Sequence, residues 1–226
     1  MAFTKSDELA DELYRQPDLE EKIGELQQRL KSEQQRRREY YAWLDEDKKA
    51  EFINGEIVVH SPVRKRNADA TKLITLLLTL FNRKHKLGYV ATEKILVQLK
   101  RNDFEPDVAF WRREKADAFT EDQLFFPAPD LIVEVLSPST EQYDRGEKFQ
   151  DYAANGIQEY WIVDSEKRVV ECYELDGATY RERAVISKGQ TLQSTAVENF
   201  SVPLMSAFDE DANQQAIFNI LGVKPL

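Results

Sequence analysis

The chain of 226 residues has little of the material on which several common chemistries depend. Its one cysteine, Cys172, cannot form an internal disulfide, which suits a protein of a reducing compartment. Its two histidines, His60 and His85, leave few residues for Ser/His or Cys/His catalysis or for a zinc site. A Gly-rich phosphate loop and a G-x-S-x-G nucleophile elbow are both missing from the sequence. These absences argue against the disulfide-rich, zinc-dependent and serine- or cysteine-nucleophile classes.

Long apolar runs are missing as well. The longest, from Leu73 to Phe81, is interrupted by Thr75 and Thr79 and is too short to span a bilayer. The first residues have no apolar stretch of the kind that forms a signal peptide. We therefore expect a soluble, cytoplasmic protein with no membrane partner.

The chain also lacks an excess of positive charge. Lys and Arg together number 31 and Asp and Glu 41, which gives a net charge of −10. This balance argues against a protein that coats nucleic acid, whose backbone needs cationic partners. It does not exclude a nuclease, because local patches matter more than the total charge. One such patch is the run Arg64, Lys65 and Arg66, which is either a solvated face or a set of phosphate contacts.

The composition fits one sizeable domain with an appendage. We expect a helical extension over residues 1–44, a domain over 45–210, and a short C-terminal helix and tail over 211–226. The extension carries apolar residues at the 4-3-4 spacing of a short coiled coil, Leu19, Ile23, Leu26 and Leu30. This seam packs either on its own domain or on a second copy. A homodimer is expected, because two exposed apolar heptads favour association.

Strand-like and helix-like segments alternate through the middle of the chain. Asn54-Gly55 between apolar runs predicts a hairpin over 52–60, and the broad apolar face of residues 65–86 is typical of a buried helix closed by Gly88. Strands are expected near 89–100, 104–111, 131–136 and 160–164, a helix over 143–155 and a second hairpin over 169–185. This order predicts an α/β (α+β) fold with a central mixed β-sheet flanked by helices.

Two carboxylates stand inside apolar, strand-like runs. Asp107 lies in the segment Pro106–Phe110, and Glu134 lies in Leu131–Ser137. A buried carboxylate is costly unless it is paired or binds a metal, and hard cations such as Mg²⁺ take oxygen ligands. The pattern therefore indicates either one metal site shared by both residues or two structural carboxylates that cap loops or pair with arginines.

Several segments, taken in order, resemble the Uma family of restriction-endonuclease-like proteins, which are abundant in cyanobacteria and belong to the PD-(D/E)XK nuclease superfamily. The resemblance covers residues from about 40 to 208 and rests on Asn54–Ile57, Ser61-Pro62, Pro106-Asp107, Glu134–Thr140, Tyr143–Phe149, Tyr152-Ala153, Gly156-Ile157 and Glu159–Asp164. It implies a restriction-endonuclease-like core. It also implies a site with Asp on one strand, Asp or Glu on the next, and Lys two residues later.

In this chain Asp107 and Glu134 match the two acidic positions, and Leu136 stands where the lysine is expected. The arrangement resembles superfamily members in which the lysine has moved to a nearby helix, which makes Lys148 the candidate. Lys148 is also placed to be an ordinary i,i+4 partner of Asp144. The sequence leaves both roles open.

The resemblance also implies a further acidic ligand from the opening hairpin or helix. Glu56 fits this place best, and Asp69 is the alternative; Asn67 stands near a position where many relatives carry histidine. The expected ligands of Mg²⁺ or Mn²⁺ are Asp107, Glu134, the carbonyl of Val135 and Glu56.

Taken together, the resemblance implies a metal-dependent endonuclease that hydrolyses phosphodiester bonds in nucleic acid, with DNA expected as the substrate. The metal would activate water and neutralise charge. Lys148 would orient that water or stabilise the developing charge, and Arg64, Lys65 and Arg66 would contact flanking phosphates. The alternative is a catalytically silent binding or interaction module on the same fold, which the acidic balance and Leu136 favour.

Overall fold

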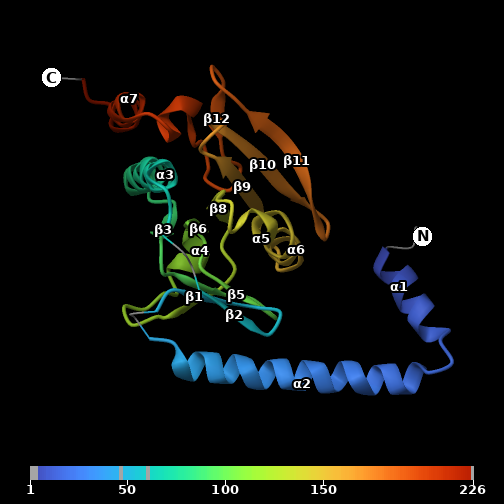
Figure 1. The fold of residues 1–226 in the computed structure, drawn as a ribbon. Helices are drawn as coiled ribbons and strands as arrows, with labels where there is room; N and C mark the ends of the chain where they lie inside the picture. The colour runs from blue at the N-terminus through green and yellow to red at the C-terminus, as the bar shows by residue number, and fades with distance from the viewer. Residues whose placement is uncertain (1–4, 46–47, 60–61, 225–226) are drawn as a thin grey trace.

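The computed structural model describes residues 5–45, 48–59 and 62–224 (Figure 1). It confirms the expected architecture, since a six-stranded mixed sheet and a five-stranded sheet are surrounded by helices. His60 and Ser61, expected at the end of the first hairpin, lie outside the described residues. Within those residues, none of the helices combines the length and apolarity needed to cross a membrane.

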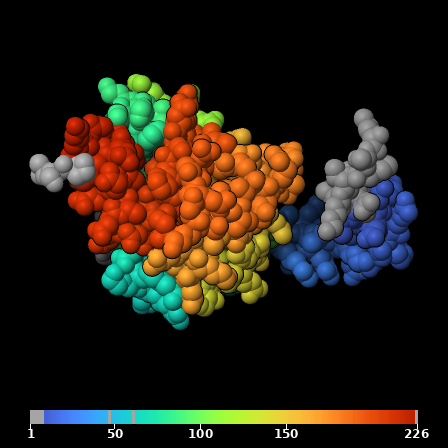
Figure 2. Space-filling view, turned by 90° about the horizontal axis from the view of Figure 1, so that it is seen from above, coloured from blue at the N-terminus to red at the C-terminus, as the bar shows by residue number. Residues whose placement is uncertain are grey.

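The N-terminal extension consists of α1 (Lys5–Tyr14) and α2 (Leu19–Trp43). The break between them contains Pro17, which has no N–H to donate to a helix ladder. Figure 1 shows α2 running past one side of the domain, with α1 turning back from its far end. In Figure 2 the blue N-terminal helices project beyond the body of the domain.

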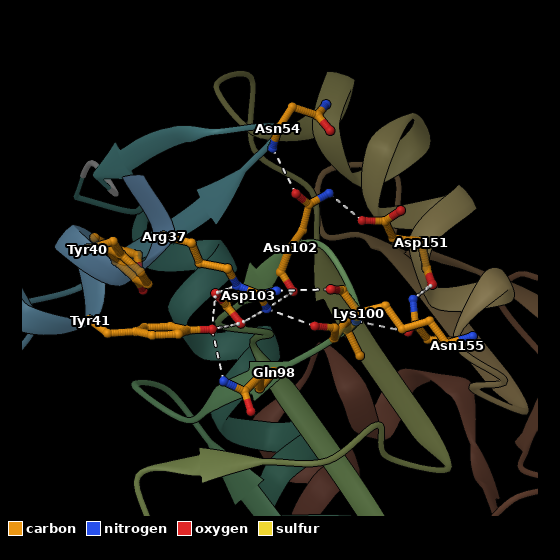
Figure 3. A network of polar contacts seen from close by, with 12 residues as sticks. Arg37, Tyr40, Tyr41, Asn54, Gln98, Lys100, Asn102, Asp103, Asp151 and Asn155 are labelled. Atoms are coloured by element: carbon orange, nitrogen blue, oxygen red, sulfur yellow. Dashed lines mark hydrogen bonds and ion pairs between the residues drawn. The ribbon is translucent and has the colours of Figure 1, made fainter. Parts of the chain in front are cut away.

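Polar contacts attach the C-terminal half of α2 to the domain. Arg37 donates to both carboxylate oxygens of Asp103, at 2.8 and 2.5 Å, and the hydroxyl of Tyr41 donates to Asp103 Oδ2 at 2.9 Å. Figure 3 shows these side chains converging on Asp103. Arg101 forms a bidentate pair with Glu33 at 2.8 and 2.9 Å. Bidentate guanidinium–carboxylate pairs are directional, so they fix the angle of α2 on the domain.

The apolar seam of α2 continues along the same face into this attached half. The seam positions after Leu30 are occupied by Glu33 and Arg37, whose side chains contact the domain. Ile23, Leu26 and Leu30 are 40, 46 and 51% exposed. One face of α2 thus binds its own domain over half its length and is open over the other half.

The six-stranded sheet has the order β11-β10-β9-β8-β6-β3, in which β8 and β9 are parallel and the other neighbours antiparallel. Its strands are β3 (Gly88–Thr92), β6 (Val108–Arg112), β8 (Leu131–Val135), β9 (Glu159–Asp164), β10 (Val169–Asp176) and β11 (Thr179–Ile186). The five-stranded sheet consists of β2 (Glu56–Val59), β1 (Ala50–Ile53), β5 (Asp103–Phe104), β4 (Leu96–Gln98) and β7 (Phe125–Phe126). A small sheet pairs β12 (Thr191–Gln193) with β13 (Ser201–Pro203).

Two elements expected to be continuous are divided. The single strand expected over 89–100 is wrong, because Glu93 and Lys94 adopt left-handed backbone angles, with φ of 48° and 50°. This turn sends β3 into the larger sheet and β4 into the smaller one. The helix expected over 143–155 is divided at Gly146, where a Cβ atom would lie 2.7 Å from the carbonyl oxygen of Gln142.

Helices cover both faces of the larger sheet. On one face lie α3 (Lys65–His85) and α7 (Glu210–Leu221), and near the other lie α5 (Glu141–Arg145) and α6 (Glu147–Ala154) (Figure 1). A short α4 (Arg113–Ala116) and a 3-10 turn (Leu204–Ala207) complete the helices of the described residues. Lys86, in the left-handed conformation, ends α3 before the expected Gly88. The C-terminal α7 is packed on α3, because Asn213 donates to the carbonyl of Leu73 at 3.0 Å.

Side chains of β8 alternate between these two faces. Leu131, Val133 and Val135 pack with α3, whereas Ile132 joins the opposite cluster, which includes residues of α6. Glu134 has the same parity as Ile132 and therefore points to the side of α6. The apolar run thus forms a strand that is buried on both faces, as expected of a central strand. Its one carboxylate, that of Glu134, lies between the sheet and α6.

Candidate active site

Asp107 and Glu134 enter one small pocket from neighbouring strands. Asp107 directly precedes β6, whose Val108 is paired with Val133 of β8, so that Asp107 and Glu134 face the same side. Asp107 Oδ2 accepts a hydrogen bond from the backbone N–H of Val135 at 2.7 Å. Asp107, Glu134 and Val135 line a pocket of about 50 Å³.

Lys148 of α6 projects into the same pocket. Its Nζ lies 3.0 Å from Glu134 Oε1, 3.0 Å from Glu51 Oε1 and 3.4 Å from Asp144 Oδ1. The sequence left open whether Lys148 pairs with Asp144 on its own helix or reaches the strand residue Glu134. In the structure its ammonium contacts both. The hydroxyl of Tyr152, one turn further along α6, donates to Glu134 Oε1 at 2.8 Å.

The strand position expected to hold a lysine serves packing instead. Leu136 is partly buried in the apolar cluster on the α6 side of the sheet. Its carbonyl accepts a hydrogen bond of 2.9 Å from Asn67 of α3, and the Asn67 side-chain oxygen accepts one of 2.6 Å from Ser165. Asn67 thus ties the end of β8, beside the pocket, to α3 and to the end of β9.

Two acidic residues of the pocket region have no counterpart in the sequence-based site. Glu51 of β1 is 1% exposed, and its Oε1 accepts a hydrogen bond of 2.8 Å from the backbone N–H of Glu105. Glu105 is 6% exposed and lines the pocket. Glu51 stands between Ala50 and Phe52 in an apolar run, which is the same signal that singled out Asp107.

The structure does not place Glu56 or Asp69 among the residues that line the pocket. Glu56 is exposed at the start of β2, two residues from Val58, which is the register partner of Glu51. Asp69 forms ion pairs on the surface of α3 with Lys65 and Lys72. Glu51 is therefore the acidic side chain of the opening hairpin that reaches Lys148.

The basic run lies at the start of α3, beside the pocket. Pro62 and Val63, which precede this helix, line the pocket themselves. Arg64 is the exposed N-cap residue, Lys65 is exposed and pairs with Asp69, and Arg66 pairs with Glu166 at 2.5 Å. The start of α3, which follows these two pocket-lining residues, thus combines basic side chains with the N-terminus of a long helix, which favours anions.

Burial and like charges shape the titration of the pocket. Burial raises the pKa of Glu134 well above its ordinary value, and Asp144, Asp107 and Glu51 raise it further against the opposing effect of Lys148. Burial also raises the pKa of Asp107, although the N–H of Val135 opposes this. Burial alone would lower the pKa of Lys148, but its carboxylate neighbours raise it well above the usual value. The site therefore keeps a charged ammonium among acids that hold protons tightly.

Within the described ranges, no three His, Cys, Asp or Glu side chains are already arranged to hold a metal ion. Mg²⁺ commonly needs only one or two carboxylates, because it keeps several waters. The pocket offers the carboxylates of Asp107 and Glu134 beside the backbone of Val135, which are hard oxygen donors. Asp144 Oδ1 is buried without a hydrogen bond, and its nearest cation is Lys148 at 3.4 Å. This donor set and surplus of carboxylate fit a divalent cation.

A mixed sheet that brings two carboxylates from adjacent strands to a buried lysine defines a restriction-endonuclease-like nuclease fold. The chain belongs to the Uma2 family, whose model, described as "Putative restriction endonuclease", matches residues 37–205.

Two proteins of a Synechocystis strain are similar in sequence, and both are described as uncharacterized. One is 52% identical over 50 residues, which span 22% of this chain and 26% of that relative. The other is 31% identical over 136 residues, 57% of this chain and 73% of the relative. A crystal structure of a "putative nuclease belonging to DUF820" from Anabaena variabilis superposes with a TM-score of 0.64 at 15% identity. It covers 74% of this chain and 94% of its own, which shows a shared fold.

Proposed function

We propose that this protein is an endonuclease that hydrolyses phosphodiester bonds in DNA with Mg²⁺ or Mn²⁺ bound at Asp107 and Glu134. Membership of the family supports a nuclease. The observation that carries the finer proposal is the pocket lined by Asp107, Glu134 and Lys148. The buried ammonium of Lys148 is shared there by Glu134, Glu51 and Asp144. Perturbed, crowded carboxylates of this kind are characteristic of functional sites.

In this proposal Asp107, Glu134 and the carbonyl of Val135 hold the cation. A bound divalent cation supplies an activated water and neutralises charge that develops on phosphate. Tyr152 and Lys148 both contact Glu134 Oε1, which fixes the carboxylate and leaves Oε2 as its ligand oxygen. Preorganisation of this kind lowers the cost of reaching a productive geometry.

Lys148 has the role of positioning the attacking water and stabilising charge on the phosphate. Its ammonium is already desolvated and held by Glu51 and Asp144, so little reorganisation is needed when a substrate oxygen approaches. Glu51 also contacts the backbone of Glu105 and thereby supports the segment that leads to Asp107. Neither role requires Glu56 or Asp69, which lie outside the lining of the pocket.

The basic start of α3 is the proposed contact for flanking phosphates. Arg64, Lys65 and Arg66 lie just beyond the two pocket-lining residues, Pro62 and Val63. Contacts to phosphate position a duplex without reading its sequence. The proposed nuclease therefore binds DNA locally through this patch, although its net charge is −10.

We also propose that the protein is a homodimer joined through the open half of α2. Ile23, Leu26 and Leu30 form an exposed stripe at coiled-coil spacing, and the attached half of the same face fixes the direction in which the stripe projects. Burying this stripe against a second copy removes apolar surface from water.

The decisive experiment measures metal-dependent DNA cleavage and metal-dependent melting on the same full-length sample. We expect Mg²⁺ or Mn²⁺ to raise the melting temperature, because a ligand that binds only the folded state stabilises it. We also expect slow nicking of DNA, because the cation activates water. Cleavage by wild type that is absent from Asp107→Asn supports the proposal. If cleavage persists in Asp107→Asn, a contaminating nuclease explains it. Absence of both the melting shift and cleavage would favour the alternative, a catalytically silent binding module on the same fold.

A further inference from the structure

A second, larger hollow adjoins the candidate active site. It has a volume of about 440 Å³ and lies between the end of α2, β4 and β7. This volume falls in the range of about 300–1,000 Å³ that is typical of small-molecule sites. Glu105 lines both this hollow and the pocket of Asp107, so the two share a wall.

The lining of the hollow combines apolar surface with charged groups of both signs. Tyr41, Leu96 and Phe125 supply apolar walls. Lys48 and Lys94 also line it, as do the carboxylates of Asp45 and Glu105, and Lys48 pairs with Asp45. The rings of Tyr41 and Phe125 meet at 5.0 Å with an interplanar angle of 65°, so they form two sides of a corner. A flat ring with hydrogen-bonding edges matches such a surface, and a nucleobase has both features.

Tyr41 is held in place from outside the hollow. Its hydroxyl donates to Asp103 Oδ2 at 2.9 Å and accepts a hydrogen bond from Gln98 at 2.9 Å (Figure 3). The guanidinium of Arg37 lies 5.6 Å from the ring centroid. A ring fixed in this way loses little freedom when a ligand packs against it, so the surface is preorganised.

The backbone conformation at Glu93 and Lys94 also shapes the hollow. Glu93 and Lys94 both have left-handed φ values, a conformation that costs free energy for residues other than glycine. This turn divides β3 from β4 and places Lys94 at the hollow. The same turn therefore separates the two sheets and supplies a cation near the candidate active site.

We propose that this hollow binds an unstacked nucleobase of DNA, adjacent to the phosphate held at Asp107 and Glu134. The inference rests on the proposed nuclease function and adds a substrate class, which is DNA that contains an unpaired nucleotide. An unpaired base enters such a hollow at lower cost than a paired one, because no base pair has to be opened. The shared wall at Glu105 sets the base and the reacting phosphate side by side.

The test compares two short fluorescein-labelled DNA duplexes that differ by one unpaired adenine. Their affinities for the full-length protein are measured by anisotropy in Ca²⁺, which takes oxygen ligands as Mg²⁺ does. We expect the bulged duplex to bind about tenfold tighter, as stacking of one base on aromatic rings implies. The same two duplexes in Mg²⁺ give the cleavage rates.

The matched variants are Leu124→Trp and Val185→Trp. Leu124 lines the hollow and is 61% exposed, so an indole there fills the hollow without removing core packing. Val185 is 46% exposed on the distant edge strand β11 and receives the same indole. Leu124→Trp should reduce the preference for the bulge to within about twofold, while Val185→Trp should keep it.

The outcomes separate this inference from the nuclease proposal. Equal affinity of wild type for both duplexes, with metal-dependent cleavage intact, overturns the base-binding hollow and leaves the nuclease. A bulge preference that survives in Leu124→Trp assigns the base to another place and also overturns it. Absence of binding and cleavage with both duplexes overturns both proposals. A preference lost only in Leu124→Trp supports the assignment.

Discussion

Glu134 and Glu159 are buried glutamates on neighbouring parallel strands of one sheet, but their surroundings differ sharply. Glu159 is 0% exposed, and its carboxylate accepts hydrogen bonds from the side chains of Trp161, Arg183 and Ser194 and from the backbone N–H groups of Thr195 and Ala196. Glu134 is 3% exposed and contacts two donors, Lys148 and Tyr152. Its other charged neighbours are carboxylates.

This difference distinguishes a structural carboxylate from a candidate catalytic one. Glu159 is surrounded by donors that hold the loop after β12 against the sheet, so its charge is compensated locally. Glu134 shares one ammonium with Glu51 and Asp144, so carboxyl groups outnumber cations around it. Burial is common to both residues; the crowding of carboxyl groups is what makes Glu134 the candidate.

The largest expected effect is on cleavage. Glu134→Gln should reduce metal-dependent DNA cleavage to the background of a metal-free sample, because it removes a ligand of the cation that activates water. Glu159→Gln should retain cleavage per folded molecule, since Glu159 lies on the opposite face of the sheet. Both are measured by plasmid nicking at matched concentrations of folded protein. Equal losses in the two variants would break the distinction between these glutamates.

The next effect is on folding free energy. Glu159→Ala leaves the indole N–H of Trp161 and two backbone N–H groups without their acceptor, so it should destabilise the protein by about 3–5 kcal/mol. Glu134→Ala should cost much less without metal, because it relieves repulsion from Asp107 and Asp144. Urea unfolding in EDTA compares the two. A larger loss for Glu134→Ala would show that its contacts with Lys148 and Tyr152 dominate that repulsion.

The next effect is on the pH dependence of the melting temperature without metal and of the shift that metal produces. In the folded protein the pKa of Glu134 lies above its ordinary value of 4.5, and those of Asp107 and Asp144 lie above 3.8. The stability that these groups contribute is therefore fully present below the ordinary values and is lost as pH rises through the folded values. The raised pKa of Lys148 keeps its contribution intact throughout this range.

In EDTA we therefore expect stability from this pocket to fall as pH rises above 4.5. Mg²⁺ binds the ionised carboxylates, so its stabilising shift should grow over the same interval. Melting curves at mildly acidic and mildly alkaline pH, with EDTA or Mg²⁺, measure both trends. Glu159→Gln is the control that should retain the metal effect. A shift that is independent of pH would place the cation elsewhere.

The smallest expected effect concerns the two halves of α2. A chain that begins at Lys31 keeps Glu33 and Arg37 but lacks the open stripe, so its free energy of unfolding per domain should change little. Its mass in light scattering should fall from dimer to monomer. Arg37→Ala is the contrasting variant, because it leaves the buried Asp103 without its cation. The same monomeric mass for full-length and shortened chains would refute the dimer.

Local patterns were sufficient to predict much of the fold. The Asn54-Gly55 hairpin, the long α3, the buried β8 and the strands around Asp107 follow from periodicity and turn chemistry. The divisions at Glu93-Lys94 and Gly146 did not, because a left-handed Glu-Lys pair and one glycine in a polar segment are weak local signals. Their cause is tertiary, since they direct adjacent segments to different partners.

The candidate site was predictable to a similar degree. Asp107 and Glu134 stand out because a carboxylate interrupts an apolar run, whereas Lys148 was implied by the family resemblance. Glu51 shows the same interruption, but a carboxylate in a short hairpin strand is usually on its solvent side. Its burial depends on how β1 packs beneath α2 and beside Glu105, which is a property of the assembled sheets.

The placement of Lys148 on α6 changes what a relative of this protein has to preserve. A search for Glu-x-Lys along one strand would pass over this chain, because the third position of that pattern is Leu136. What defines the pocket is the 3.0 Å approach of Nζ to Glu134 Oε1, which a helix achieves as well as a strand. A comparison of atom positions in space would find this arrangement where a search for that three-residue pattern would not.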